Sequence, residues 1–228
     1  MNAKQILTAT AISDRLVPLA YLPLEHPEIA LAEYQRTRGQ FAGTAAAAGG
    51  NSVSLADSRL APLWSELDAD RTMLMLHPGT TPDARLDEFY LSNLLGNPVE
   101  TGIAAAQLVF GNVLSRYPAM RVMLVHCGGS VPSVAGRWQR GVDTARPGVS
   151  AEIEPPVKAM RRFYVDCLAH DSAVVDLAAT VFGADRIVLG SDWPFAMGTS
   201  DPKALVAHRG AEFAQRAAND NARAVLGQ

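Results

Sequence analysis

The chain has 228 residues, of which 48% are apolar and 19% charged, and its formal net charge is −3. This composition is typical of a globular protein, and the length allows one large domain or two small ones. Lysine and arginine are scattered, so there is no basic face of the kind that binds nucleic acid. No apolar run is long enough to span a membrane, and the N-terminus lacks a signal-peptide pattern. We therefore expect a cytoplasmic protein.

Six short apolar runs predict β-strands, at residues 16–24, 43–50, 72–79, 121–129, 163–169 and 186–192. Most are apolar without alternation, which is typical of parallel strands covered on both faces. Cys127 and Cys167 fall near the ends of two of these strands, which favours buried, reduced thiols over a disulfide.

Helical patterns separate the strands. Apolar residues recur at helical spacing over 100–118, before Pro118. A second helix begins at Asp171 or Ser172, either of which can cap its first turn, and ends at Gly183. Two further patterns predict a helix over 201–218, opened by a capping Asp201 and Pro202, and a short closing helix over 219–227. The segment 145–156 is predicted to be an irregular loop.

Strands that alternate with helices indicate right-handed βαβ units on a parallel sheet, either an open doubly wound sheet or a (β/α)8 barrel. No glycine-rich nucleotide-binding motif follows any strand, so nothing favours the open sheet. Polar residues instead follow several different strands, as in a barrel, whose active site lies at the C-terminal ends of the strands. We therefore predict an α/β fold of the TIM-barrel type, forming one domain over residues 1–228.

Three of these polar residues share a local pattern. His77, His126 and Asp192 each end an apolar run, and Gly or Pro follows closely in HPG, HCGG and SDWP. Two imidazoles and one carboxylate at the C-terminal ends of the strands form a plausible ligand set for Zn²⁺ or a similar divalent ion. For each residue alone, a structural hydrogen bond or a turn is the competing interpretation.

Other polar residues are weaker candidates for residues of a functional site. His170 follows a strand and could line the site or position the start of the next helix, whereas His26 and His208 are expected to lie in solvent. Arg137 could bind a substrate carboxylate through its two-pronged guanidinium group. Cys127 has no obvious general base other than its neighbour His126, so a Cys–His pair is not expected.

The motifs LHPG, VMLVHCGGSVPSVAGR, FYVDCLAHDS, ADRIVLGSDWPF and NARAVLG resemble the amidohydrolase-2 family, and within it the aminocarboxymuconate-semialdehyde decarboxylases. The resemblance covers nearly the whole chain from about Asp14. It implies a (β/α)8 barrel with one divalent metal ion, most often Zn²⁺, and His77 and Asp192 among its ligands. It also implies an acid/base role for His126 beside the metal. Arg137 would recognise a substrate carboxylate across a dimer interface, and His170 and Trp193 would contribute to the substrate site.

The chain departs from the family pattern at its beginning. Members carry H-x-H or E-x-H at the end of the first strand, and no H-x-H occurs here. Counting strands back from His77 predicts that the first two βα units are absent, along with two metal ligands. The protein could begin upstream, receive these strands from a separate polypeptide, or be a degenerate homologue. Because open sheet edges aggregate, we expect a homodimer or a partner to cover the open edge.

The resemblance implies a metal-dependent carboxy-lyase acting on a small unsaturated or aromatic carboxylic acid. One alternative is a hydrolase of the same superfamily that cleaves an ester, lactone or amide. The other alternative is a non-catalytic subunit that keeps the fold for binding or assembly.

Overall fold

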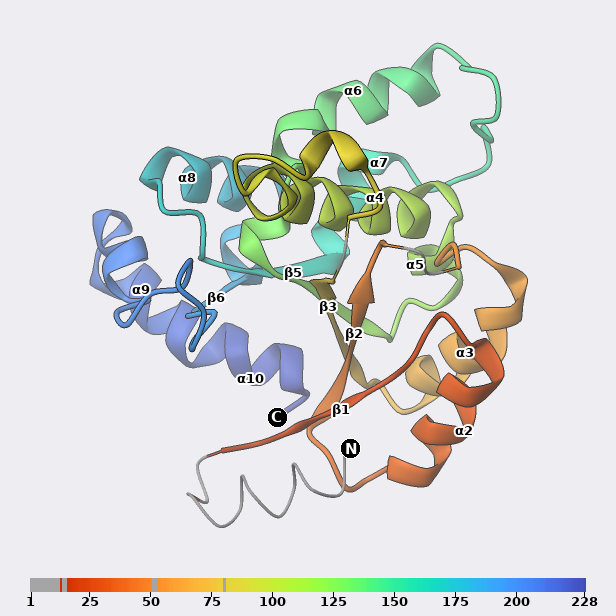
Figure 1. Cartoon of the computed structure of the whole chain (residues 1–228), viewed down its shortest axis with the longest axis horizontal. Coiled ribbons are helices and arrows are strands. Elements are labelled where there is room, and N and C mark those ends of the chain that lie inside the picture. Colours follow the sequence, from red (N-terminus) through yellow and green to blue (C-terminus); the bar gives the residue numbers. More distant parts are fainter. Residues whose placement is uncertain (1–12, 14–15, 51–52, 80) are drawn as a thin grey trace.

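The computed structural model describes residue 13 and residues 16–50, 53–79 and 81–228. Six parallel strands form one sheet in sequence order (Figure 1): β1 (Leu19–Tyr21), β2 (Gly43–Ala48), β3 (Met73–Pro78), β4 (Arg121–Leu124), β5 (Phe163–Asp166) and β6 (Ile187–Val188). All six predicted strands are therefore confirmed. Each is shorter than its apolar run, and after β4 and β6 the run continues into the segments that carry His126 and Asp192.

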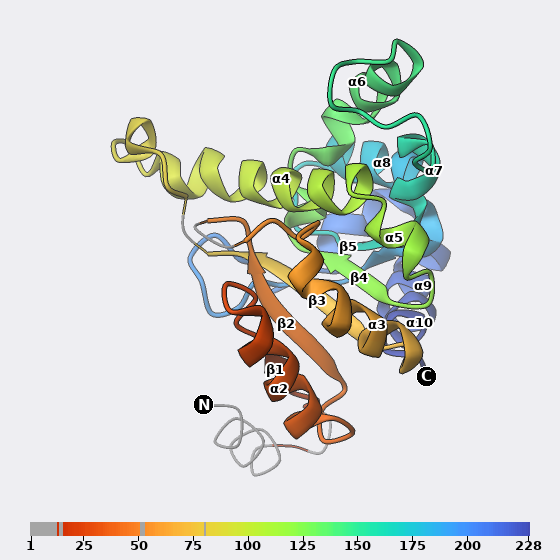
Figure 2. The same cartoon turned by 90° about the vertical axis from the view of Figure 1, so that its right-hand side faces the viewer.

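Helices connect the strands: α2 (Pro27–Thr37), α3 (Ala61–Ala69), α4 (Asn97–Phe110), α5 (Val113–Arg116), α6 (Val131–Asp143), α7 (Pro156–Ala159), α8 (Ser172–Val181), α9 (Ala211–Ala218) and α10 (Asp220–Leu226). They surround the sheet, from α2 and α3 on one side, past α4, to α9 and α10 on the other (Figures 1 and 2). None of these helices in the described part of the chain combines the length and the apolar character needed to cross a bilayer.

The architecture is that of a (β/α)8 barrel of which six strands are present. Each strand pairs only with its neighbours in sequence, as in a barrel wall, and a helix-containing segment separates successive strands. Within the described residues β1 and β6 do not pair with each other, so the sheet is open. The predicted fold class is confirmed, and the open sheet agrees with the expected absence of two units.

The two faces of the strands carry different contacts, because successive side chains point to opposite faces. Leu74 and Leu76 of β3 belong to the main core between sheet and helices. Met73 belongs to a smaller cluster on the other face, against which Met75 packs. The same alternation places His77 on the face of Met73 and Met75, at the C-terminal end of β3. The metal-ligand candidate thus lies on the inner face of the partial barrel.

The predicted helix over 100–118 is present as α4 and α5, with a break at Gly111 and Asn112. Asn112 has a φ of 54°, in the left-handed region, which a continuous helix does not allow. The helix predicted after residue 170 is confirmed as α8: the carboxylate of Asp171 accepts a hydrogen bond from the backbone N–H of Ala173 at 2.8 Å.

The prediction of one helix over 201–218 was wrong. A 3₁₀ helix spans Ala204–Arg209, and α9 begins only at Ala211. Gly210 between them has a φ of 86°, a conformation that glycine adopts readily and that ends a helix. The closing helix is confirmed as α10.

Candidate active site

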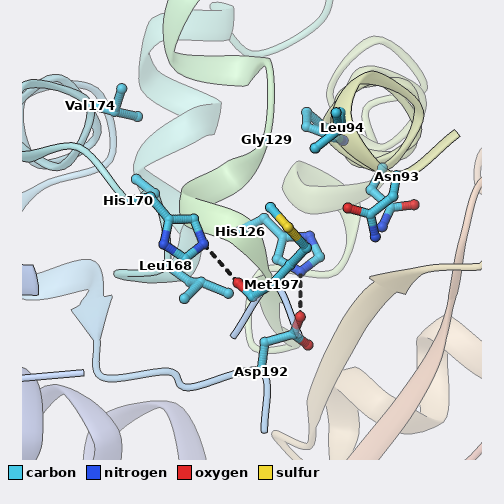
Figure 3. Close-up of a pocket in the computed structure, with 12 residues that line it drawn as sticks. Asn93, Leu94, His126, Gly129, Leu168, His170, Val174, Asp192 and Met197 are labelled. Atoms are coloured by element: carbon cyan, nitrogen blue, oxygen red, sulfur yellow. Dashed lines mark hydrogen bonds and ion pairs between the residues drawn. The ribbon is translucent and has the colours of Figure 1, made fainter. Parts of the chain in front are cut away.

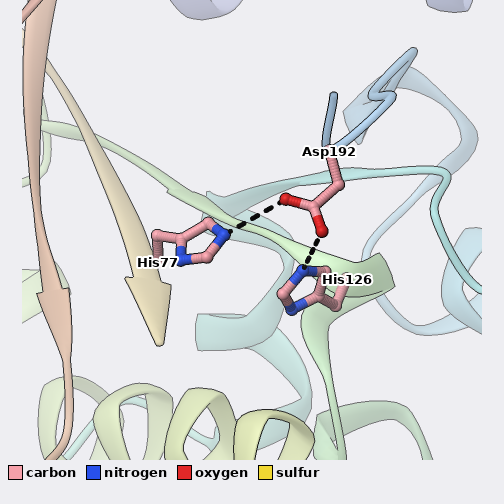
Figure 4. Close-up of side chains that lie close together, drawn as sticks. All are labelled: His77, His126 and Asp192. Atoms are coloured by element: carbon pink, nitrogen blue, oxygen red, sulfur yellow. Dashed lines mark hydrogen bonds and ion pairs between the residues drawn. The ribbon is translucent and has the colours of Figure 1, made fainter. Parts of the chain in front are cut away.

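His77, His126 and Asp192 meet at the C-terminal end of the sheet. Nε2 of His77 lies 3.4 Å from Oδ1 of Asp192, and Nε2 of His126 lies 3.6 Å from Oδ2 of the same carboxylate. Figure 4 shows both rings pointing toward the carboxylate. One ligand atom from each residue lies within 4.8 Å of the other two. The predicted convergence of these side chains is therefore present.

A backbone contact fixes the orientation of the His77 ring. Nδ1 lies 2.8 Å from the carbonyl oxygen of Pro78, and because a carbonyl only accepts, Nδ1 carries the proton. In the neutral ring, Nε2 then keeps its lone pair and faces Asp192. Histidine ligands of metal ions are commonly oriented in this way, by a hydrogen bond from the ring nitrogen that does not bind the metal.

The HCGG sequence forms a tight turn immediately after β4. Four successive residues have positive φ values: His126 (54°), Cys127 (55°), Gly128 (79°) and Gly129 (59°). A strand cannot contain such residues, so the predicted strand over 121–129 was too long at this end. An added Cβ on Gly128 would lie 2.6 Å from the Phe182 ring, so the glycine is also required sterically. The turn brings the His126 side chain toward Asp192.

Asp166, at the end of β5, holds this turn in place. Its carboxylate accepts hydrogen bonds from the backbone N–H groups of His126 (3.0 Å), Cys127 (2.8 Å) and Leu168 (3.0 Å). Successive N–H groups in a left-handed turn form a concave anion-binding surface, which an internal carboxylate fills here. Burial raises the pKa of Asp166, whereas the three N–H groups favour its charged form.

The loop after β6 packs directly on Asp166. An added Cβ on Gly190 would lie 2.6 Å from Cβ of Asp166, so only glycine allows this approach. Asp192 follows two residues later, with a φ of 51°. Asp166 therefore contacts two of the three segments that carry His77, His126 and Asp192, namely the His126 turn and the Asp192 loop.

Positive φ values recur at the strand ends around this site. His126, His170 and Asp192 each follow a different strand, and each has φ between 51° and 55°. Such values are uncommon outside glycine and cluster at functional sites, where the surrounding structure holds them.

A cavity of about 260 Å³ is lined by two of the three residues, His126 and Asp192. Figure 3 shows His126, Asp192 and His170 around it, with Leu94 and Asn93 on the opposite side. Leu168, Val174 and Met197 add apolar surface, and Asn97, Pro98, Gly129 and Ala169 complete the lining. Ligand pockets commonly measure about 300–1,000 Å³, so this cavity of about 260 Å³ lies just below that range and has room only for a small molecule.

His170 lines the cavity, in agreement with one of its two sequence interpretations. Its Nε2–H donates a hydrogen bond to the carbonyl oxygen of Met197 at 2.7 Å, which links the end of β5 to the loop after β6 (Figure 3). The other candidate substrate residues do not line the cavity. Arg137 is exposed on α6, and the Trp193 side chain is 79% exposed.

The remaining histidines and cysteines agree with the sequence analysis. His26 and His208 are exposed and lie away from the cavity. Cys127 and Cys167 are both buried and free, and burial raises the pKa of each thiol, to about 11 for Cys167. A buried thiol in its protonated form is a poor nucleophile, which argues against a Cys–His pair.

The environment also sets the charge of His126. Burial, followed by the nearby His77, lowers the pKa of its imidazole. A neutral imidazole can donate a lone pair to a metal ion or accept a proton. The donor set of two imidazole nitrogens and one carboxylate fits a divalent transition ion, because it offers the N and O ligands that Zn²⁺ and Mn²⁺ accept.

Sequence reasoning missed Asp166 and the two amide side chains of the cavity, Asn93 and Asn97. For Asp166 a signal existed: it is the one charged residue in the apolar run FYVDCLA. A buried carboxylate needs several hydrogen-bond donors. Asn93 and Asn97 lie in or next to a π-helical segment, Ser92–Gly96, that no sequence pattern indicated.

The model of the family described as amidohydrolase matches residues 1–228, and the chain belongs to this family. The resemblance found in the motifs is thus confirmed. A 2-amino-3-carboxymuconate-6-semialdehyde decarboxylase from Dictyostelium discoideum is 30% identical over 197 residues, which cover 84% of this chain and 55% of that protein. A 6-methylsalicylic acid decarboxylase from Penicillium expansum is 29% identical over 150 residues, covering 65% of this chain and 46% of that protein.

Solved structures show the same fold. A dihydroxybenzoic acid decarboxylase from Polaromonas sp., solved with bound manganese and the inhibitor 2-nitroresorcinol, matches with a TM-score of 0.86 at 20% identity. The match covers 99% of this chain and 73% of that structure. The chain spans about half of the length of the two curated relatives named above.

Proposed function

We propose that this chain carries most of the barrel of a metal-dependent decarboxylase that acts on a small unsaturated or aromatic carboxylic acid. The observation that carries the proposal is the convergence of His77, His126 and Asp192 beside a small cavity. The names of the relatives and of the matched structure support it, since each is a decarboxylase of such an acid.

His77 and Asp192 are the residues that would hold the metal ion, which we propose to be Zn²⁺. When bound, such an ion supplies Lewis acidity toward a substrate oxygen. His126 lines the cavity together with Asp192, and its imidazole would take up a proton from solvent and deliver it to the substrate carbon in place of the carboxylate. The carbon–carbon bond breaks, its electron pair stays on the substrate carbon, and that carbon takes up one proton as CO₂ leaves.

The cavity lining supports a flat, partly polar substrate. Leu94, Leu168 and Val174 offer apolar contacts for a ring or a conjugated chain. Asn93 and Asn97 offer amide groups for polar substituents. Arg137 is exposed, so we propose that it reaches a substrate carboxylate only across an interface with a second copy of the chain. Trp193 remains a predicted substrate contact on the exposed loop after β6.

The test is to measure CO₂ release from a panel of hydroxybenzoic acids and unsaturated dicarboxylic acids, with Zn²⁺ or Mn²⁺ added to metal-free protein. We expect metal-dependent CO₂ release that is lost in the His126→Asn variant. Asp87→Asn is the matched control, because Asp87 is exposed and lies outside the cavity.

Two outcomes would contradict the proposal. Ring opening or ester cleavage without CO₂ would instead indicate a hydrolase of the same family. No turnover with any metal, together with unchanged metal content in a His77→Ala variant, would indicate a non-catalytic chain.

A further inference from the structure

A second cavity, of about 380 Å³, lies at the opposite end of the strands from the candidate active site. It is formed by residues that precede or begin β3, β4, β5 and β6. Five of these are arginines: Arg71, Arg121, Arg161, Arg162 and Arg186. Leu114, Pro118, Ala119, Met120 and Tyr164 complete the lining. The cavity beside the candidate active site, by contrast, has no arginine or lysine in its lining.

The five arginines of this cavity carry more positive charge than the carboxylates paired with them neutralise. Arg162 is paired with the carboxylate of Glu154 at 2.7 Å, and Arg186 lies 3.4 Å from Asp185, whose side chain is 73% exposed. The other three arginines have no carboxylate within ion-pair distance among the described residues. This local excess stands out in a chain whose net charge is −3.

Contacts with uncharged groups orient three of the five guanidinium groups. Arg186 stacks over the ring of Tyr164, 4.7 Å from its centroid. Arg121 donates a hydrogen bond to the carbonyl of Arg71, and Arg161 donates one to the carbonyl of Thr180 at 3.3 Å. These contacts involve uncharged groups, so they hold the arginines in place without neutralising them. Groups of like charge held together destabilise each other unless an anion lies between them.

We propose that this cavity binds a small phosphate-type oxyanion, with a diphosphate as the best-fitting class. The planar guanidinium group forms paired hydrogen bonds with phosphate oxygens, and several arginines around one cavity provide them from different sides. The volume admits a small polyanion rather than a macromolecular segment. The site is separate from the metal-binding residues, so it does not depend on the function proposed above.

The test is isothermal titration calorimetry of metal-free protein with inorganic pyrophosphate and with inorganic phosphate, at physiological ionic strength. We expect saturable binding to one site, tighter for pyrophosphate. Arg161→Gln and Arg71→Gln, at two exposed positions, should each weaken binding by about tenfold, the effect of one lost charge-assisted contact. Arg140→Gln, an exposed arginine of α6 outside the cavity, should leave binding unchanged.

Citrate is the comparison ligand, since it carries a similar charge on carboxylates. Weaker binding of citrate than of pyrophosphate would support the phosphate class. The proposal is overturned if no saturable binding occurs, if citrate binds as tightly, or if Arg140→Gln weakens binding as much as Arg161→Gln does. Thermal unfolding of each variant without ligand shows that the fold is retained.

Discussion

Nε2 of His77 lies 3.4 Å from Oδ1 of Asp192, although 115 residues separate the two in the sequence. The contact joins the end of β3 to the loop after β6. The same carboxylate faces Nε2 of His126 through its other oxygen, so Asp192 lies between two imidazole rings. Its replacement is therefore the most direct test of the metal site.

Asp192→Asn should abolish tight metal binding. The amide removes the negative charge between the two rings. We expect the affinity for Mn²⁺ to fall by more than about 100-fold, because even residues that only support metal ligands account for about 10–100-fold. Titration calorimetry measures the loss, with Asp87→Asn as control. Equal affinities in the two variants would show that Asp192 does not bind the ion.

His126→Asn and His77→Asn should differ in their effect on metal content. His77 is proposed as a ligand and His126 as the proton carrier, so His126→Asn should retain the metal and lose turnover, whereas His77→Asn should lose both. Elemental analysis of the purified variants, together with CO₂ release, separates the two roles. If both variants lose metal equally, His126 is itself a ligand.

Asp166→Ala should destabilise the protein by at least about 3 kcal/mol. The substitution leaves two buried N–H groups and one partly buried N–H group without an acceptor, and each unsatisfied group costs about 1–3 kcal/mol. Urea unfolding measures the change in the free energy of unfolding. Asp87→Asn should change it by no more than about 0.5 kcal/mol, as is usual for exposed positions. A small effect of Asp166→Ala would mean that the HCGG turn holds its shape without the carboxylate.

Tyr34 should make the stability fall as the pH rises above 10. Its hydroxyl donates to Oδ2 of Asp70 at 2.6 Å and lies 2.8 Å from Oγ1 of Thr72. Burial, followed by the hydrogen bond to Asp70, raises the pKa of Tyr34 from 10.0 to about 12. An unfolded chain releases this proton near pH 10 and the folded chain does not, so stability present below pH 10 is lost progressively up to about pH 12.

Tyr34→Phe should remove this part of the pH dependence and cost about 1 kcal/mol at pH 7, the net value of one hydrogen bond. Chemical unfolding at pH 7, 10 and 11 measures both effects. If the free energy of unfolding falls as steeply with rising pH in the variant as in the original protein, groups other than Tyr34 cause the loss of stability at alkaline pH.

The sequence alone determined the order of the six strands, the barrel-type fold and the three residues that converge. These features depend on local apolar runs and on the rule that parallel strands end at one edge, so they can be inferred without coordinates. The sequence also narrowed the cap of α8 to Asp171 or Ser172, because a capping side chain acts on a backbone N–H only two or three residues away, and the structure identifies Asp171.

Only the tertiary structure showed the role of Asp166, the break at Gly210 and the cluster of arginines at the N-terminal ends of the strands. Asp166 acts on a turn 39 and 40 residues away, and the five arginines come from four different strand starts. Such relationships depend on which strands are neighbours and on their register, and no local periodicity encodes either. The sequence could not show that Arg137 lies outside the cavity for the same reason: the direction of α6 relative to the sheet is set by packing between distant segments.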